Sequence, residues 1–563
     1  MVASRLRAQE ETISRIRTAF GTPSISCGVL HHGDIVFLHS EGFANVEKNL
    51  VASSETVYSI ASCSKGFVTA LCHILVREGK LSWTRPIREY LPDFNTPHDP
   101  EIARRATLLD LCSHGTGLAP LDHAGCGFYD EFYNKGEDQV HIASHLPVAY
   151  DFRSRWLYNN FMLGVVGDVI SAVCGKSAGT VLKEKIFDPL GLYRTCTNAA
   201  GYPSDANVAT GYSVLDDGSL LPSADPKLED GSVQGASGFI RSTVSDMLSW
   251  ARSIMLAEGD SKPLRQHRQD EDRSCVLDGI EFTRCARRPI TYDCGVNENS
   301  YGLGWFRHQL PSKWLGSIGP NFALLPDPPV IARTGGSRLT ICHYGEFGGF
   351  LSSFYTFPDT CSAVIVLANS SPSRGDPTDL IAQTFIQELF DMQPKVMLEE
   401  YAVHAAQTSK LIWPALVEEW VSSRVQNTMM PPLDQFTGNY SNPGLMMDIH
   451  IFELQNDQRG TGPNPEVLGF SINSMKKQRG KLRHYHYDVW TFLPHSRDDL
   501  VRKGMEGYML LPMLLFSFVR HSDGRVYAMD WDLQAGACEG PAPGLDRAVA
   551  PVRFVRQAEK KQT

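Results

Sequence analysis

Two side chains at the start of an apolar segment have the types and the spacing of a nucleophile and its base. Ser62 and Lys65 begin a helical pattern in which Phe67, Val68 and Leu71 share one face. Residues three positions apart lie on the same side of a helix, so we expect the hydroxyl and the amine within mutual reach. Burial lowers the pKa of a lysine, by roughly 3 to 5 units when it is complete, and makes it a base near neutral pH. The pattern indicates acyl-serine chemistry, with the Ser62 backbone N–H as an oxyanion donor.

The same spacing occurs a second time, at Ser474 and Lys477. Ser474 leaves a β-prone run and enters the basic loop 476–479, whereas Ser62 opens an apolar helix behind a pair of predicted strands. A buried helix start supplies both a desolvated lysine and aligned backbone N–H groups. We therefore assign the chemistry to Ser62 and treat Ser474 as a chance match.

A loop about a hundred residues further on offers a phenol and an amide. Tyr158 and Asn160 stand two apart, and we expect the phenol to relay a proton while the amide orients the lysine or a substrate carbonyl. A second Tyr-x-Asn pattern, Tyr440 to Asn442, lies at the start of the C-terminal region. Position relative to Ser62 favours Tyr158.

A third element is the strand-like run 341–350, which contains His343, Gly345 and Glu346. Alternation along a strand places His343 and Gly345 on one face, and Gly345 would allow close approach of a bound acyl group. The Glu346 backbone N–H is the second predicted oxyanion donor. We predict His343, Gly345 and Glu346, together with Asn160, as substrate-binding residues.

The elements that must position these groups predict an α/β fold. Five strand-like runs suit one antiparallel sheet flanked by helices: 25–30, 35–38, 339–344, 351–357 and 363–367. Amphipathic helices are expected at 1–20, where Leu6, Ile13, Ile16 and Phe20 form a stripe, and at 378–390. A helical subdomain is expected between about residues 81 and 256, followed by an insertion at 258–329.

Beyond Pro431-Pro432 the texture changes to short β-prone runs separated by turns, which predicts a C-terminal antiparallel β-barrel. The predicted domains are a hydrolase-like unit at 1–397, a helical connector at 398–430 and the barrel at 431–563.

Composition narrows the partners. The net charge of -10, from 53 Lys+Arg and 63 Asp+Glu, argues against nucleic-acid and anionic-membrane binding. Thirteen cysteines without a repeated C-x-x-C spacing, and no signal-like or membrane-spanning apolar run, predict a cytoplasmic protein with reduced thiols. No cofactor and no metal is expected, and the oligomeric state is left open.

The three motifs, taken in order, resemble those of the serine β-lactamase-related superfamily. This group includes class C β-lactamases, D,D-peptidases, D-aminopeptidases, β-lactamase-type carboxylesterases and the acyltransferase of the fungal lovastatin pathway. The resemblance covers about residues 5 to 395 and extends to further segments: Gly79-Lys80-Leu81, Tyr90-Leu91-Pro92, Ser113-His114-Gly115-Thr116-Gly117-Leu118, Gly235-Ala236-Ser237-Gly238-Phe239 and Ser242-Thr243-Val244-Ser245-Asp246. It also suggests that the C-terminal barrel is lipocalin-like.

The resemblance implies that Ser62 is the acylated nucleophile and that Lys65 and Tyr158 handle protons. Class C β-lactamases carry a lysine where His343 stands, so the resemblance favours an intracellular ester, thioester or amide of a small molecule, either free or carrier-bound, in metabolism or secondary metabolism. Three alternatives stay open: transfer of the acyl group to an alcohol or amine, β-lactamase or D-aminopeptidase activity, and an inactive scaffold.

Overall fold

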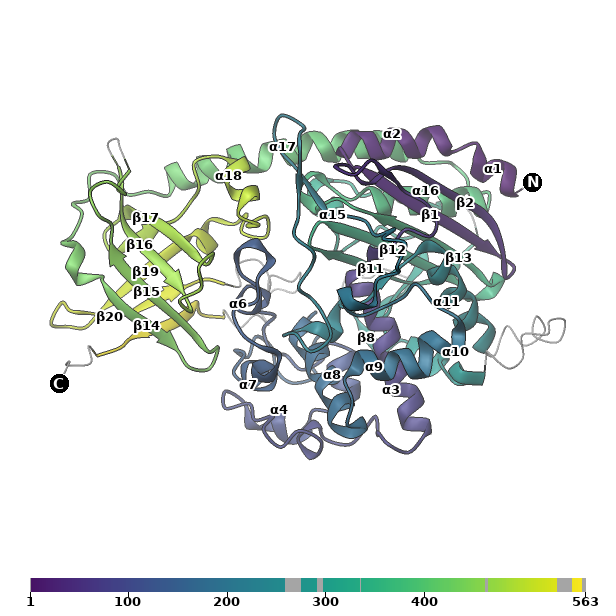
Figure 1. Ribbon diagram of the computed structural model, residues 1–563, viewed down its shortest axis with the longest axis horizontal. Coiled ribbons are helices and arrows are strands. Elements are labelled where there is room, and N and C mark those ends of the chain that lie inside the picture. The colour runs from purple at the N-terminus through teal and green to yellow at the C-terminus, as the bar shows by residue number, and fades with distance from the viewer. Residues whose placement is uncertain are drawn as a thin grey trace.

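The computed structural model describes residues 2–258, 275–290, 297–334, 336–460, 464–533 and 549–558. Within these ranges the chain forms a sheet-and-helix unit and a closed barrel, joined by the long helix α17 (Leu398–Ser422) (Figure 1). Both the α/β class and the C-terminal barrel agree with the sequence prediction.

The described part of the first unit is built on one antiparallel sheet of nine strands. Its spatial order is β3 (Leu50–Val51), β2 (Asp34–Asn45), β1 (Ser24–His31), β13 (Ser362–Ala368), β12 (Phe350–Phe357), β11 (Arg338–Phe347), β10 (Phe306–Leu310), β9 (Asn299–Tyr301) and β8 (Arg288–Pro289). The central strands β12 and β13 are buried along their whole length, as expected for a sheet covered on both faces.

The sheet is larger than the predicted five strands, because part of the predicted insertion joins its edge. β9 pairs with β10 and β10 with β11, with Phe306 opposite Cys342. These strands are short and carry polar residues such as Arg307, His308 and Gln309, so no apolar run marked them in the sequence. Residues 259–274 and 291–296 of the predicted insertion lie outside the described residues.

Helices cover the two faces of the sheet (Figure 1). One face carries α1 (Val2–Arg7), α2 (Glu10–Phe20) and α16 (Pro377–Leu389), with α17 packed against them. The apolar stripe predicted at the N-terminus is buried there, although the helix breaks between α1 and α2. The Asp376 side chain caps α16 by accepting from the backbone of Thr378 and Asp379.

The other face carries α11 (Val244–Ala257), α3 (Ser64–Arg77) and the helical subdomain. That subdomain contains α4 (Pro100–Arg105), α5 (Leu108–Cys112), α6 (Asp122–Gly125), α7 (Gln139–Ser144), α8 (Asn160–Cys174), α9 (Ala178–Leu182) and α10 (Asp188–Leu190). Among the described residues no single helix is long and apolar enough to cross a bilayer. One pair passes the same test only jointly, Asn160–Cys174 with Ala178–Leu190, and it is bent by 75°.

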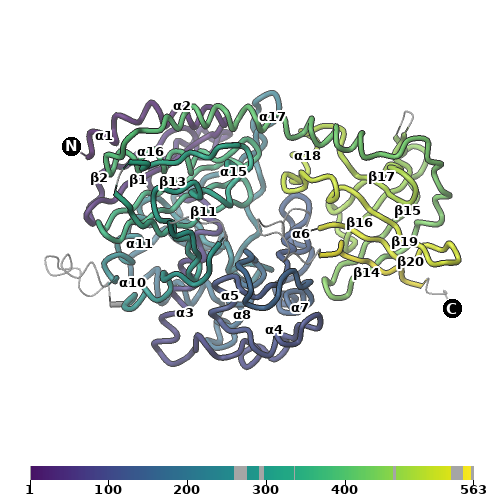
Figure 2. Tube along the Cα trace, turned by 180° about the vertical axis from the view of Figure 1, so that it is seen from behind, coloured from purple at the N-terminus to yellow at the C-terminus, as the bar shows by residue number. Residues whose placement is uncertain are grey.

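The barrel closes on itself through eight antiparallel strands. They are β14 (Gly438–Asn442), β15 (Met447–Glu453), β16 (Glu466–Ile472), β17 (Arg479–His486), β18 (Val489–Thr491), β19 (Leu515–Arg520), β20 (Val526–Trp531) and β21 (Val552–Arg556). Aromatic rings pack inside it; Phe470 and Phe516, for example, lie 5.2 Å apart between centroids. Seen from behind, the barrel lies beside the helical subdomain, with α6 and α18 (Arg497–Arg502) between them (Figure 2).

Candidate active site

Ser62 lies in a single 3-10 turn, Ala61–Cys63, that leads directly into α3. Ala61 has a φ of 42°, a left-handed conformation that costs a non-glycine residue roughly 1 kcal/mol or more. Neighbouring elements hold this turn: the Ile60 N–H donates to the Ile240 carbonyl (3.0 Å), and the Ser352 hydroxyl donates to the Ile60 carbonyl (2.9 Å). The backbone before Ser62 is therefore fixed from two sides.

Lys65 is completely buried one helical turn after Ser62. Its Nζ donates to the Ser62 hydroxyl (2.8 Å) and to the backbone carbonyl of Ser237 (2.8 Å). Burial lowers the pKa of this amine to about 7, and the Asp122 carboxyl opposes that shift. A lysine with this pKa exists as the neutral base in a large fraction of molecules near neutral pH.

Tyr158 covers this pair from the loop before α8. The Lys65 Nζ lies 4.8 Å from the centre of its ring. Burial raises the pKa of the Tyr158 phenol, and the neighbouring Ser62 hydroxyl acts in the opposite direction. The buried ring of His114 packs 4.4 Å from the Tyr158 ring, and its Nδ1 accepts from the Asn159 N–H (3.2 Å). His114 thus positions the loop that carries Tyr158.

Asn160 opens α8 and faces a carboxyl group. Its Nδ2 donates to Asp122 (3.1 Å), and its Oδ1 has no hydrogen-bond partner among the described residues. Gln234 donates to the other oxygen of Asp122 (3.2 Å). Burial raises the pKa of Asp122 to about 6, with the amide hydrogen bonds and Lys65 opposing the shift. Asn160 therefore lines the cavity and also holds Asp122, the carboxyl group that acts to raise the pKa of Lys65.

The predicted residues of the third element, β11, are placed differently from one another. The His343 ring is fully buried: its Nδ1 donates to the Tyr344 carbonyl (2.7 Å), and its Nε2 accepts from the Tyr301 hydroxyl (3.0 Å). Burial and Lys65 lower its pKa to about 3, so the ring is neutral. Both ring nitrogens are used within the protein, which makes His343 a support for β11 in this structure.

Gly345 has a steric reason to be glycine. A Cβ at this position would lie 2.2 Å from the Ile60 carbonyl oxygen and 2.4 Å from the Ser352 hydroxyl. The backbone that leads to Ser62 thus fills the space where a Cβ would stand. Gly345 also lines the cavity. Glycine here lets the strand and the nucleophile turn come together.

Ser62, Tyr158, Asn160, Gly345 and Glu346 line one cavity of about 260 Å³. Asp122, Asn160 and Glu346 also line a neighbouring cleft of about 430 Å³, which continues toward the barrel.

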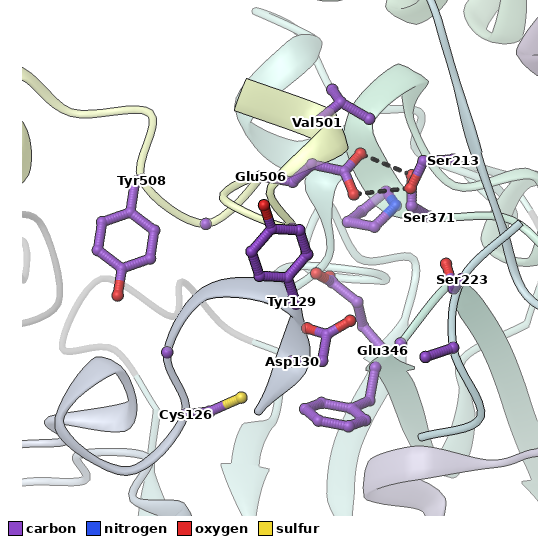
Figure 3. Close-up of a pocket in the computed structure, with 18 of the residues that line it drawn as sticks. Cys126, Tyr129, Asp130, Ser213, Ser223, Glu346, Ser371, Val501, Glu506 and Tyr508 are labelled. Carbon is purple, nitrogen blue, oxygen red and sulfur yellow. Dashed lines mark hydrogen bonds between the residues drawn. The ribbon is translucent and has the colours of Figure 1, made fainter. Parts of the chain in front are cut away.

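Figure 3 shows this cleft, with Asp130 and Glu346 gathered near Glu506 of the barrel domain. Glu506 accepts hydrogen bonds from Ser371 (2.9 Å) and Ser213 (2.8 Å). Desolvation by the surrounding walls, Asp376 and Glu506 raise the pKa of Glu346 to about 7, while its side chain stays exposed to solvent in the cleft. The cleft is therefore lined with carboxyl groups from separate segments.

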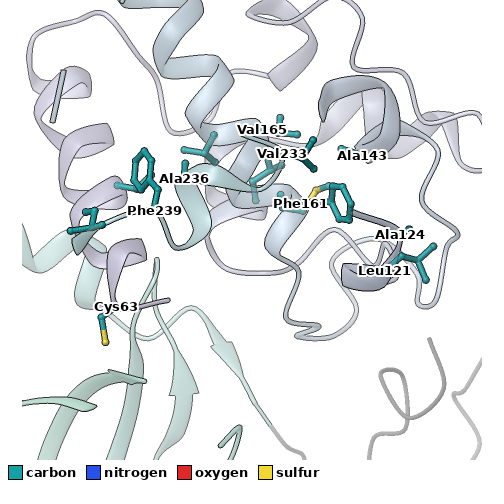
Figure 4. Packing of buried hydrophobic residues seen from close by; sticks show 14 of the residues in the cluster. Cys63, Leu121, Ala124, Ala143, Phe161, Val165, Val233, Ala236 and Phe239 are labelled. Carbon is teal, nitrogen blue, oxygen red and sulfur yellow. The ribbon is translucent and has the colours of Figure 1, made fainter. Parts of the chain in front are cut away.

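The groups around Ser62 rest on one apolar cluster (Figure 4). Its members directly flank the site residues in sequence: Cys63 follows Ser62, Leu121 precedes Asp122, Phe161 follows Asn160, and Ala236 precedes Ser237. Segments distant in the chain thus meet because their neighbours share a core. This arrangement keeps the polar groups at the edge of the cluster in fixed positions.

Sequence reasoning missed three contributors. Asp122 accepts a hydrogen bond from Asn160, and the Ser237 carbonyl accepts one from Lys65. Glu506 lines the cleft from the barrel domain. Ser237 lies in a segment noted only for its resemblance. Neither Asp122 nor Glu506 belongs to a spacing pattern, so no local signal marks them.

Known proteins resemble this chain in sequence and in fold. A family model named Beta-lactamase matches residues 10–387. The chain is 26% identical over 457 residues to the unguisins hydrolase of Aspergillus campestris, covering 77% of this chain and 75% of that protein. It is 23% identical over 369 residues to a beta-lactamase of Escherichia coli, covering 63% of this chain and 86% of that protein. The octameric penicillin-binding protein homologue from Pyrococcus abyssi shares the fold, with a TM-score of 0.55 at 18% identity over 98% of this chain and 99% of that one.

Proposed function

The chain belongs to the Beta-lactamase family, and from this premise we propose that it hydrolyses an ester, thioester or amide of a small molecule through a covalent acyl-Ser62 intermediate. One observation carries the proposal. The Ser62 hydroxyl lines a cavity and lies 2.8 Å from the Nζ of a buried lysine whose pKa is about 7.

In the proposed reaction, neutral Lys65 takes the proton of Ser62 as the Ser62 Oγ bonds to the substrate carbonyl carbon. The carbonyl electrons move to oxygen, and the backbone N–H groups of Ser62 and Glu346 stabilise that oxyanion. The bond to the leaving group then breaks, and the leaving group receives the proton through Tyr158. A water molecule then attacks the acyl carbonyl carbon and gives its proton to the base. The bond to the Ser62 Oγ breaks, which releases the acid and restores Ser62.

Two features favour esters and amides over β-lactams that carry a carboxylate. His343 is neutral and buried, so it presents no cation to such a group. The cleft lining includes four carboxyl groups, Asp122, Asp130, Glu346 and Glu506, against two basic side chains, Lys477 and Arg502, so the balance of charge disfavours an anion. The similarity to an unguisins hydrolase supports a secondary-metabolite substrate.

The test is covalent labelling with a fluorophosphonate, combined with turnover of p-nitrophenyl butyrate and of nitrocefin. We expect labelling and ester turnover in the native enzyme, loss of both in Ser62→Ala, and retention of both in the matched control Ser474→Ala. Nitrocefin should be the slower substrate. Labelling that survives Ser62→Ala, or an unlabelled native protein, would contradict the proposal and favour an inactive scaffold.

Transfer to an acceptor is the competing outcome at the deacylation step. Incubation with an acyl thioester and added alcohols or amines separates the two, because hydrolysis yields the free acid and transfer yields a new ester or amide. We expect the acid to dominate.

A further inference from the structure

An apolar cavity of about 190 Å³ opens beside the Ser62 cavity, between the catalytic unit and the barrel domain. It shares Pro320 and Glu346 with the Ser62 cavity, and Pro372, Val501 and Glu506 with the acidic cleft. The three cavities therefore adjoin one another around Glu346.

Three helices form much of the wall of this cavity: one from the catalytic unit, the connecting helix and one from the barrel domain. α15 (Pro320–Leu324) and α17 contribute from one side, and α18 with the segment after it contributes from the barrel side. The apolar lining residues are Pro320, Ala323, Leu324, Pro372, Ile412, Leu500, Val501 and Met509; the polar ones are Glu346, Ser373, Arg497 and Glu506. Apolar side chains around an open space favour an apolar occupant over water.

The barrel side of the cavity is held in place. Arg497, only 5% exposed, donates to the Val214 carbonyl (3.1 Å) and to Asp216 (3.0 Å). The two serine hydrogen bonds of Glu506 fix the other end of the same segment. A wall anchored at both ends presents a formed cavity rather than one that the ligand must open.

We propose that this cavity is the subsite for an apolar acyl chain of the substrate, so that the barrel domain takes part in substrate recognition. The proposal rests on the proposed acyl-Ser62 chemistry. Glu346 follows Gly345 on β11, the strand that would lie along the bound acyl group, and the cavity begins at Glu346. An aliphatic or aromatic chain attached to the reacting carbonyl would continue past Glu346 into the space walled by Ala323, Leu500 and Met509.

The experiment compares two fluorophosphonates that differ only in the alkyl group on phosphorus, methyl or hexyl. In each, the Ser62 Oγ bonds to phosphorus and fluoride leaves, so the alkyl group takes the place of the acyl chain. We expect the native enzyme to react at least roughly tenfold faster with the hexyl reagent, from the apolar contacts of several methylene groups.

Two variants change the cavity from opposite sides. Ala323 is exposed, so Ala323→Phe fills the cavity without entering the core, and the hexyl-to-methyl rate ratio should fall about tenfold. Met509→Ala widens it from the barrel side and should raise the rate for a decyl reagent about threefold relative to hexyl. Ala8→Phe, at an exposed alanine between α1 and α2, is the matched control and should leave every ratio unchanged.

The outcomes separate the two proposals. If neither reagent labels Ser62, the proposed function is wrong and the subsite is overturned with it. If Ser62 is labelled but Ala323→Phe and Met509→Ala leave the ratios as in the native enzyme, the subsite alone is overturned. A variant that reduces both rates equally also counts against the subsite, because a filled acyl cavity must discriminate by chain length.

Discussion

Two Ser-x-x-Lys segments, one in the sheet-and-helix unit and one in the barrel domain, differ in burial and in neighbours. Lys65 is fully buried and hydrogen-bonded to Ser62, whereas Lys477 is exposed and forms an ion pair with Glu131 (2.9 Å). Ser474 lies in an exposed turn with a φ of 55°. Spacing alone therefore says little; desolvation of the lysine and a fixed contact with the serine make the first segment a candidate for catalysis.

The two Tyr-x-Asn segments show the same contrast. Tyr158 faces Lys65 and lines a cavity, whereas the hydroxyl of the buried Tyr440 donates to the Phe436 carbonyl (2.8 Å) within the barrel. Asn442 donates to the Arg553 carbonyl (3.0 Å). In the barrel the pattern serves packing and strand closure.

The largest expected effect is the loss of the buried amine. Lys65→Met should lower kcat/KM for p-nitrophenyl butyrate by roughly a thousandfold or more, because Ser62 loses its base. Lys477→Met should change it less than about threefold. Initial rates of both variants, with circular dichroism as a folding check, test the contrast. Equal losses in the two variants would show that general charge, and not the Ser62 contact, is responsible.

The two tyrosines should separate activity from stability. Tyr158→Phe should lower kcat by roughly a hundredfold, within the usual range for a proton relay. Tyr440→Phe should keep kcat and cost about 1 to 2 kcal/mol in the free energy of unfolding, because it leaves the Phe436 carbonyl without its donor. Denaturant unfolding and steady-state rates measure the two effects. An unaltered kcat in Tyr158→Phe would remove that residue from the mechanism.

The pH dependence of activity tests whether neutral Lys65 is the base. Because the neutral form of Lys65 is the active base and its pKa is about 7, kcat/KM should rise about tenfold per pH unit below pH 7 and level off above it. A neutral ester measured from pH 5.5 to 9 gives the profile. An activity that is constant over this range would contradict the role of Lys65.

The smallest expected effect concerns the carboxyl groups of the cleft. The raised pKa of Glu346, about 7, means that the folded protein binds its proton more tightly than the unfolded chain between about pH 4.5 and 7. The free energy of unfolding therefore falls as pH rises through this window, because the carboxyl group ionises more readily in the unfolded chain.

Because the Glu346 side chain is exposed to the cleft, solvent screening reduces this effect, and Glu346→Gln should raise the melting temperature at pH 8 by roughly one degree and leave it nearly unchanged at pH 4.5. The control is Glu453→Gln on the exposed face of β15, where the carboxylate is paired with Arg459. An equal gain at both pH values would show that the effect does not come from ionisation.

Much of the architecture could be predicted because it depends on local periodicity. Apolar patterns with the period of a strand or a helix mark the core strands β1, β12 and β13 and the helix after Ser62. Similar patterns mark the β-prone runs of the barrel. The edge strands β9 and β10 could not be predicted in this way. They are short and polar, and their burial depends on pairing with β11.

The amino-acid sequence by itself determined the candidate nucleophile, base and phenol, since Ser62 and Lys65 share one helical turn and Tyr158 stands in a short local pattern. Only the tertiary structure decided what surrounds them. In the folded chain the His343 ring is buried against Tyr301, and Asp122 lies beside Asn160. Glu506 and α18 of the barrel domain line the cavities next to Ser62. The physical reason is that pKa values and cavity walls depend on desolvation and on contacts between segments far apart in the chain, which no local spacing encodes.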